Sequence, residues 1–318
     1  MKKSLIALAV AGAMTAPIVA QADATLYGNV EVEAIFGDNF ATGEGADADL
    51  EVDDAIIGVK GASDLENLEG VQAYYQMEVE FNRNADPFGS TDTGSVVTRK
   101  ALVGLESDFG YLIFGRQNNL ANAAEVMDKY AESFSTNNYF AVVDRLGNAA
   151  SYVTPKFAGF EAYGQIVVDG EGDDARDDVD GGTVGFNYNL GGFGASVSYM
   201  EWDDGLGDTN EVSTVGLGYS IADLTLEGQY QNAENNSTNI DSDMWGVGAA
   251  YALGNAKIGA TYMDFEIDDL DVESDEWGVY ASYALGKKAS VKAQYTSADV
   301  DGDSGDYDKF VVGYNVSF

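Results

Sequence analysis

The dominant pattern along the chain is an alternation of apolar and polar residues with a period of two. In the segment 72–81, QAYYQMEVEF, the odd-numbered positions from 75 onward are apolar, and the even-numbered ones are glutamine or glutamate. The segments 275–285 (DEWGVYASYAL) and 288–297 (KASVKAQYTS) repeat this arrangement. Alternation of this kind predicts β-strands with one apolar and one polar side.

The pattern recurs often enough to predict about sixteen strands in succession. Prolines agree with this interpretation, because Pro87 and Pro155 fall in a loop and at a strand end, where no ladder hydrogen bond is lost. The predicted strands cover residues 24–37, 50–62, 69–83, 96–107, 109–117, 148–155, 158–169, 181–190, 192–203, 210–221, 223–233, 242–253, 255–266, 274–285, 287–298 and 307–318.

The connections between these strands alternate between two kinds. Short turns such as LGGFG (190–194) and LGKK (285–288) alternate along the chain with long acidic loops such as 169–181 and 298–308. An up-and-down meander places all its short turns at one end, and outer-membrane barrels place them on the periplasmic side. We therefore predict an all-β fold, a transmembrane antiparallel up-and-down β-barrel with long acidic extracellular loops.

A soluble sandwich and a β-solenoid would also show alternation, so the pattern alone does not say which side is inside. Aromatic residues such as Tyr27, Trp202 and Phe318 cluster near the ends of the segments. Two aromatic girdles at the membrane interfaces require this placement, and it favours the barrel. We find no internal repeat beyond the hairpin, and we predict one barrel domain over residues 23–318.

The first 22 residues, MKKSLIALAVAGAMTAPIVAQA, have the three-part pattern of a cleaved signal peptide. Two lysines precede an apolar stretch, and Ala20-Gln21-Ala22 forms a small-residue cleavage site. No later apolar run approaches the 20 residues of a transmembrane helix. Export without a helical anchor leaves a secreted protein or a barrel in a bacterial outer membrane, and we expect the latter.

The charge and composition exclude several function classes. The chain has 54 acidic and 16 basic residues, a net charge of −38, and it contains neither His nor Cys. Such a chain repels nucleic acid, so no nucleic-acid partner is expected. Without His, the usual acid–base triads cannot form, and barrel enzymes are excluded with them. We expect no enzymatic activity and no cofactor.

One acidic loop, residues 299–308 (DVDGDSGDYD), resembles a calcium-binding loop. An EF-hand would need Gly at position 304 and Glu at position 310, where Ser and Phe stand. We therefore predict no dedicated metal site and only weak, diffuse binding of divalent cations by the acidic loops.

Several segments resemble the general diffusion porins of Gram-negative bacteria. RKALVGLESDFGYLIFGRQNN (99–119) resembles their strand–turn–strand signature before the third loop, and DRLGNAASYVTPKFAGFEAYGQ (144–165) resembles the segment after it. YGNVEVEAIF (27–36) and VVGYNVSF (311–318) resemble the strands that close such barrels. The resemblance implies a trimeric 16-stranded barrel whose third loop folds into the lumen. It also implies outer-membrane lipid and lipopolysaccharide as the surroundings.

The longest connection, residues 118–146, would be this third loop. Its first half, NNLANAAEVMDKYAESF, is rich in Ala and begins with Asn, which predicts a short helix. Glu125, Asp128 and Glu132 share one face of that helix. Taken alone, this acidic face would be the solvated side of a surface loop. The resemblance to porins implies instead that its acids line the pore constriction.

The resemblance places a basic wall opposite those acids. Strand parity puts Lys60 on the polar side of its strand. It puts Arg99 on the same side as Ala101 and Val103, opposite Leu102. Arg145 falls on the same side as Ser151. In the family, bases matching Arg99 and Arg145 face the acids of loop three, and the resulting field separates ion paths. The same parity makes four further residues lumen-facing: Glu78, Glu80, Lys292 and Lys309.

The expected function is an outer-membrane porin for passive diffusion of ions and small hydrophilic solutes. Few bases and many acidic loops predict selectivity for cations. A substrate-specific channel is the main alternative, but such channels usually line their lumen with aromatics, and here most strand aromatics share the lipid-side parity. A structural or adhesin barrel is the third possibility, and single-channel current would distinguish it.

The chain ends on KFVVGYNVSF (309–318), in which every second residue from Phe310 to Phe318 is apolar. In a barrel the last strand pairs with the first and does not fray. Tyr314, Val316 and Phe318 also resemble the C-terminal signal that the outer-membrane assembly machinery reads. We therefore expect these residues to face outward and to bind that machinery during insertion.

Overall fold

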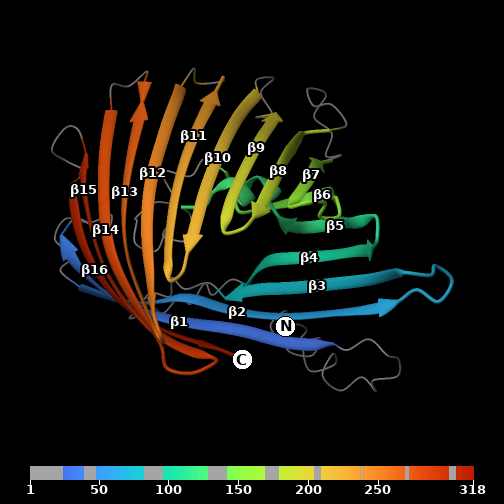
Figure 1. Ribbon diagram of the computed structural model, residues 1–318, viewed down its shortest axis with the longest axis horizontal. Helices are drawn as coiled ribbons and strands as arrows, with labels where there is room; N and C mark the ends of the chain where they lie inside the picture. Colours follow the sequence, from blue (N-terminus) through green and yellow to red (C-terminus); the bar gives the residue numbers. More distant parts are fainter. Residues whose placement is uncertain are drawn as a thin grey trace, which may run out of the picture.

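The computed structural model describes residues 24–38, 48–81, 96–127, 142–168, 179–203, 209–236, 238, 240–268, 272–300 and 306–318. Within these ranges the chain forms sixteen antiparallel strands, each paired with its neighbour in sequence. The last strand pairs with the first, so the sheet closes into a barrel (Figure 1). The predicted signal peptide, residues 1–22, lies outside the described residues.

The sixteen predicted strands are confirmed. They are β1 (Thr25–Asp38), β2 (Ala48–Asp64), β3 (Val71–Phe81), β4 (Val96–Ser107), β5 (Gly110–Asn118), β6 (Arg145–Val153), β7 (Phe160–Val167), β8 (Gly181–Leu190), β9 (Phe193–Asp203), β10 (Thr209–Ile221), β11 (Leu224–Asn235), β12 (Ile240–Leu253), β13 (Ala256–Ile267), β14 (Val272–Ala284), β15 (Ala289–Val300) and β16 (Tyr307–Ser317).

The apolar side of the strands faces outward, as a barrel in lipid requires and a sandwich would not allow. On β12, Trp245 is 43% and Val247 49% exposed on the outer face, whereas Met244 faces the lumen and is buried. No helix in the described part of the chain is long and apolar enough to cross a membrane.

The short turns use backbone conformations that suit tight hairpins. Between β8 and β9, Gly191 and Gly192 both have positive φ, at 59° and 86°. Two successive positive φ values match the right-handed twist of the flanking strands. The sequence therefore places its glycines where the chain must reverse within two residues.

The C-terminal strand is held along its whole length, as predicted. It pairs with β1 from Asp38 to Asn29, and the backbone N–H of Phe318 donates to the carbonyl of Gly28 at 3.1 Å. Tyr314 and Phe318 lie on the outer face and are about half exposed, at 49% and 48%. Val316 shares their face because it pairs with the outward Val30.

Two aromatics expected at the membrane girdles face the lumen instead. The Tyr27 hydroxyl donates to Glu78 at 2.7 Å and accepts from Gln76 at 2.7 Å, and both partners are inward residues of β3. Trp202 packs on the buried inner cluster that includes Met200. The position of an aromatic residue near a strand end therefore does not determine whether it faces the lipid or the lumen. Strand register determines this.

Candidate functional site in the barrel lumen

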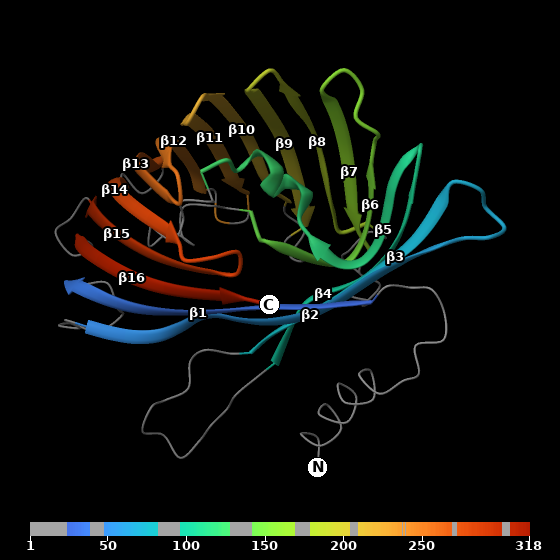
Figure 2. The same ribbon diagram turned by 60° about the horizontal axis from the view of Figure 1, so that its bottom comes forward.

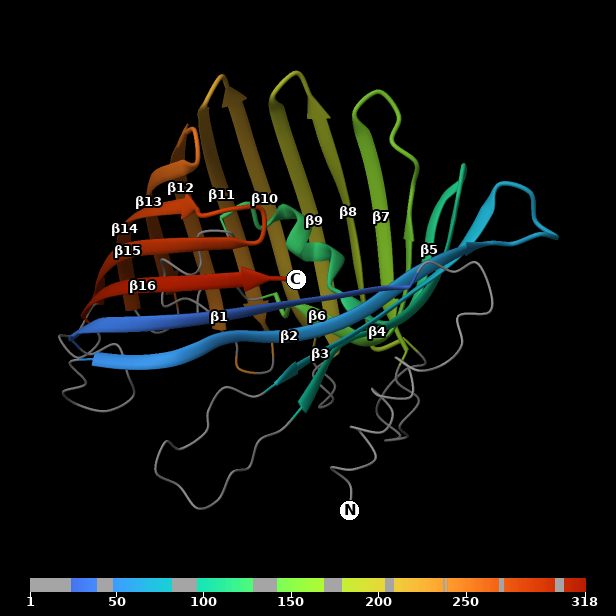
Figure 3. The same ribbon diagram turned by 90° about the horizontal axis from the view of Figure 1, so that it is seen from below.

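The third long connection enters the barrel, and its first part packs on the inner wall (Figures 2 and 3). A short 3-10 helix, η1 (Leu120–Ala124), follows β5, and the Asn119 side chain caps it by accepting from the Ala121 N–H at 3.1 Å. The Leu120 N–H donates to the amide oxygen of Gln165 on β7 at 3.0 Å. The predicted helical start with an Asn cap is confirmed, although the helix is shorter than predicted.

A second contact fixes the loop further along. The Met127 N–H donates to the Gln229 side chain on β11 at 2.9 Å, and the Met127 side chain packs with Met244 and Met263. Gly216 on β10 makes room for the chain, because a Cβ there would lie 2.4 Å from the carbonyl oxygen of Ala124. The described start of loop three, up to Met127, is thus held by neutral side chains from β7 to β13.

The predicted acidic face of the loop is only partly described. Glu125 is 5% exposed, and its carboxylate accepts from the amide of Gln231 on β11 at 2.9 Å. A wall amide 106 positions later in the chain thus binds the carboxylate, and the place of Glu125 at the constriction stays a prediction. Asp128 and Glu132 lie outside the described residues.

A group of buried ion pairs lies on β3 and β4. The Arg99 guanidinium binds Glu78 through Nε at 3.0 Å and Glu80 through Nη1 at 2.6 Å. All three side chains are largely buried, with exposures of 19%, 8% and 17%. Each of the three charged groups therefore has an oppositely charged partner within the wall, and the hydrogen bonds are of the charge-assisted type.

Arg99 reaches the lumen for a different reason from the one predicted. Gln76, which faces the lumen, pairs with Leu102, whereas Tyr75 pairs with Val103, which is 59% exposed on the outer face. Strict alternation would therefore turn Arg99 outward with Val103. A β-bulge next to Glu78 inserts one extra residue on β4 and turns Arg99 inward.

Next to the bulge, regular alternation turns a second base inward, one that the sequence analysis missed. Lys100 pairs with Glu78 in the ladder, and its ammonium lies 4.0 Å from the Glu78 carboxylate. The signal was present as two adjacent bases in TRKA, but a strict period of two allows only one of them to face the lumen. Lys100 is held by one long contact, whereas Arg99 is bound by two carboxylates.

The two other predicted wall bases complete this region. Arg145 begins β6, its Nη1 lies 3.3 Å from Asp144, and it interacts electrostatically with Arg99, Glu78 and Glu80. Lys60 is exposed, with its ammonium 5.4 Å from the ring centre of Tyr27. We call Lys60, Arg99, Lys100 and Arg145 the basic wall.

The other predicted lumen residues lie at the seam where β16 meets β1. The Lys292 ammonium lies 2.7 Å from Glu31 and 2.5 Å from Glu33. Lys309 faces a group of acids that includes Glu33 and Glu276. Both lysines thus face the lumen and acidic partners there.

Among the described residues, one group offers several carboxylates that could hold a cation. Oxygens of Glu33, Glu51 and Asp53 lie within 4.8 Å of one another. The Lys292 ammonium already contacts Glu33, so a fixed positive charge compensates part of this group. That the chain has no dedicated metal site stays a prediction.

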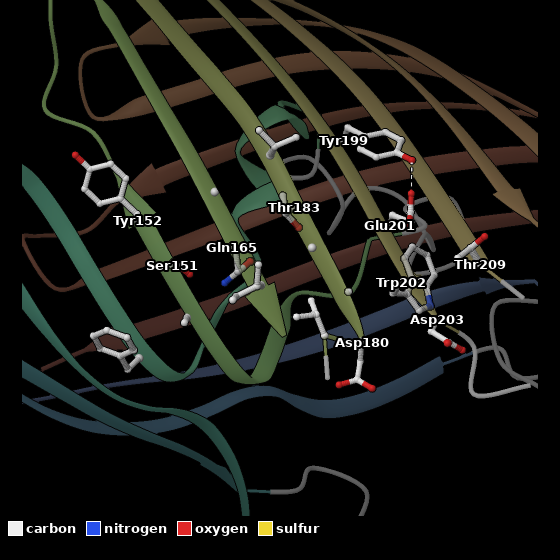
Figure 4. Close-up of a pocket in the computed structure, with 18 of the residues that line it drawn as sticks. Ser151, Tyr152, Gln165, Asp180, Thr183, Tyr199, Glu201, Trp202, Asp203 and Thr209 are labelled. Carbon is white, nitrogen blue, oxygen red and sulfur yellow. Dashed lines mark hydrogen bonds between the residues drawn. The ribbon is translucent and has the colours of Figure 1, made fainter. Parts of the chain in front are cut away.

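A groove of about 670 Å³ crosses the wall between β5 and β10 (Figure 4). Its polar lining includes Gln165 and Thr183, which already bind the start of loop three. At its other end, Tyr199 donates to Glu201 at 2.8 Å. The groove therefore borders the loop anchor and does not offer an independent set of reactive groups.

Comparison with known proteins agrees with this geometry. A family model described as "Gram-negative porin" matches residues 7–303. The chain is 32% identical over 202 residues to the "Major outer membrane protein P.IB" of Neisseria meningitidis, a match that covers 61% of this chain and 57% of that protein. The chain thus aligns with less than two thirds of that relative's length.

Solved structures show the same fold at lower identity. An anion-selective porin from Comamonas acidovorans superposes with a TM-score of 0.75 and 19% identity, and covers 94% of this chain and 100% of its own. The trimer form of OmpT from Vibrio cholerae superposes with a TM-score of 0.68 and 16% identity, and covers 94% and 100%. At these identities the likeness shows the fold alone.

Proposed function

Because the chain belongs to the Gram-negative porin family and is an outer-membrane β-barrel, we propose that it forms a water-filled channel for passive diffusion of ions and small hydrophilic solutes. A closed barrel with charged and amide side chains on its inner face supports this proposal. The sequence contains neither His nor Cys, so Ser–His and Cys–His nucleophile–base pairs are absent.

We propose further that the channel favours cations. The observation that carries this proposal is the pairing of Arg99, the most strongly bound base of the wall, with both Glu78 and Glu80. A base neutralised in this way attracts anions weakly, and the chain as a whole carries a net charge of −38. The anion selectivity named for the Comamonas porin belongs to that protein.

The test is the reversal potential of the refolded protein in a planar bilayer with a salt gradient. We expect the sign that corresponds to cation movement down the gradient, and a weaker preference at high salt because screening grows. A reversal potential of anion-selective sign would contradict the proposal. Failure to conduct at all would instead favour a structural barrel.

We propose that the working unit is a homotrimer in outer-membrane lipid and lipopolysaccharide. The family resemblance supports the trimer, as does the trimer form named for OmpT. The outward faces of Tyr314, Val316 and Phe318 leave them accessible to the assembly machinery before insertion. Size-exclusion chromatography of the folded protein in detergent would separate a trimer from a single barrel.

A further inference from the structure

The side chain of Lys292 lies across a neighbouring strand. Lys292 begins on β15 and pairs with Gly313 of β16, yet its ammonium contacts Glu31 and Glu33 on β1, one strand further on. A Cβ on Gly313 would lie 2.6 Å from Cε and 2.8 Å from Cγ of Lys292. The glycine therefore leaves the space through which the lysine crosses the closing strand.

The contacts at the far end are those of a buried ion-paired group. The exposures of the Lys292, Glu31 and Glu33 side chains are 15%, 7% and 8%. The second carboxylate oxygen of Glu31 accepts from the Asn315 amide at 2.9 Å. Charges held in a wall of low dielectric are screened less than charges in water, so their sum acts on the lumen beside them.

The sum of these charges depends on Lys292. Glu31 and Glu33 face the same lumen as Glu51 and Asp53, whose oxygens lie within 4.8 Å of those of Glu33. Lys292 is the base whose ammonium contacts both glutamates of β1. Without it, this part of the wall would present a larger negative charge to permeating ions.

We propose that Lys292 is a specificity-determining residue of the channel, which limits cation preference by masking Glu31 and Glu33 across the barrel seam. This inference rests on the proposed function, because it concerns the same permeation path. It places a determinant of selectivity at the β15–β16–β1 seam, apart from the basic wall and from loop three.

The direct test is Lys292→Met, which keeps much of the stem and removes the charge. We expect the cation-to-anion permeability ratio from reversal potentials to rise about two-fold or more, because two carboxylates lose a compensating charge. Lys288→Met is the matched control, since Lys288 lies exposed in the turn before β15 and the net charge changes equally. The control should shift the ratio little.

A second pair of variants separates charge from folding. Gly313→Ala keeps every charge but fills the space that the lysine crosses, so the ratio should shift in the same direction as in Lys292→Met. Adding Glu31→Gln and Glu33→Gln to Lys292→Met takes the net charge of these three side chains from −1 to 0, so the ratio should fall below that of the unaltered channel. The triple variant should fold even if Lys292→Met does not, because it leaves no buried carboxylate without the lysine that paired with it.

The outcomes distinguish the two proposals. An anion-selective unaltered channel would overturn the proposed cation selectivity. A cation-selective unaltered channel in which Lys292→Met and Lys288→Met give equal ratios would overturn the role of Lys292 alone. If Lys292→Met does not fold, the triple variant gives the test. A triple variant whose cation-to-anion permeability ratio equals or exceeds that of the unaltered channel would also overturn the role of Lys292.

Discussion

The inner wall of the barrel has two kinds of region, one lined by ion-paired side chains and one lined by neutral side chains. Around β2 to β6 and at the seam, bases and acids bind one another, as Arg99 does with Glu78 and Glu80. The strands that hold loop three use amides, hydroxyls and methionines instead, as Gln165 and Met244 do.

The difference shows what each region must accomplish. Where loop three packs on the wall, its buried backbone N–H groups need partners, and neutral amides supply them without adding a charge to the contact. The charged region meets the permeating solution, and each buried charge there needs a partner. Polar residues on lumen-facing positions therefore serve two separate purposes, anchoring and electrostatics.

The largest expected effect is on single-channel conductance, and it should follow from filling the space beneath loop three. In Gly216→Val, the new Cβ would lie 2.4 Å from the Ala124 carbonyl oxygen and 2.7 Å from Val126 Cγ1. Overpacking of this kind costs about 1–3 kcal/mol, and the loop should leave the wall. We expect a rise in single-channel conductance.

The matched control for that variant lies two residues along the same strand. Gly218 also faces the lumen, but the atom nearest to a Cβ added there would be 3.8 Å away, so Gly218→Val should leave the loop in place. Equal conductances for the two variants would show that the Gly216 contact does not hold the loop.

The next effect concerns the charged region. Arg99→Ala leaves Glu78 and Glu80 without their main partner, and removing one member of a buried pair costs about 3 kcal/mol. We expect a lower midpoint in urea unfolding and a stronger cation preference. Lys100→Ala should do less, because Lys100 makes one contact of 4.0 Å to Glu78. Equal effects of the two variants would refute the distinction between them.

The sequence was sufficient for the strands and their order, because a period of two is a local property of each segment. It did not place every boundary: the strand predicted at residues 148–155 forms at Arg145–Val153. Nor did it place Lys100, because it gave the lumen side of β4 to Arg99 and its odd-numbered neighbours. Lys100 faces the lumen by regular alternation, and Arg99 does so because of the bulge beside it.

The partners of loop three were beyond sequence analysis for another reason. Glu125 is bound by Gln231, and Met127 by Gln229, each more than 100 positions later in the chain. Such pairings depend on the register of several strands between them, so errors in single registers accumulate. The lumen side of a residue was thus predictable more often than the group that it would bind there.

The smallest effect is expected at Glu125, an acidic residue that the strands holding loop three bind through the Gln231 amide. Glu125→Gln removes one negative charge but leaves an amide oxygen that can still accept from Gln231 Nε2. A neutral hydrogen bond is weaker than a charge-assisted one, so the free energy of unfolding should fall by about 1 kcal/mol or less. Conductance should stay unchanged and cation preference should decrease slightly, by less than Lys292→Met increases it. A conductance increase as large as that of Gly216→Val would show that the charge of Glu125, and not its hydrogen bond, keeps the loop on the wall.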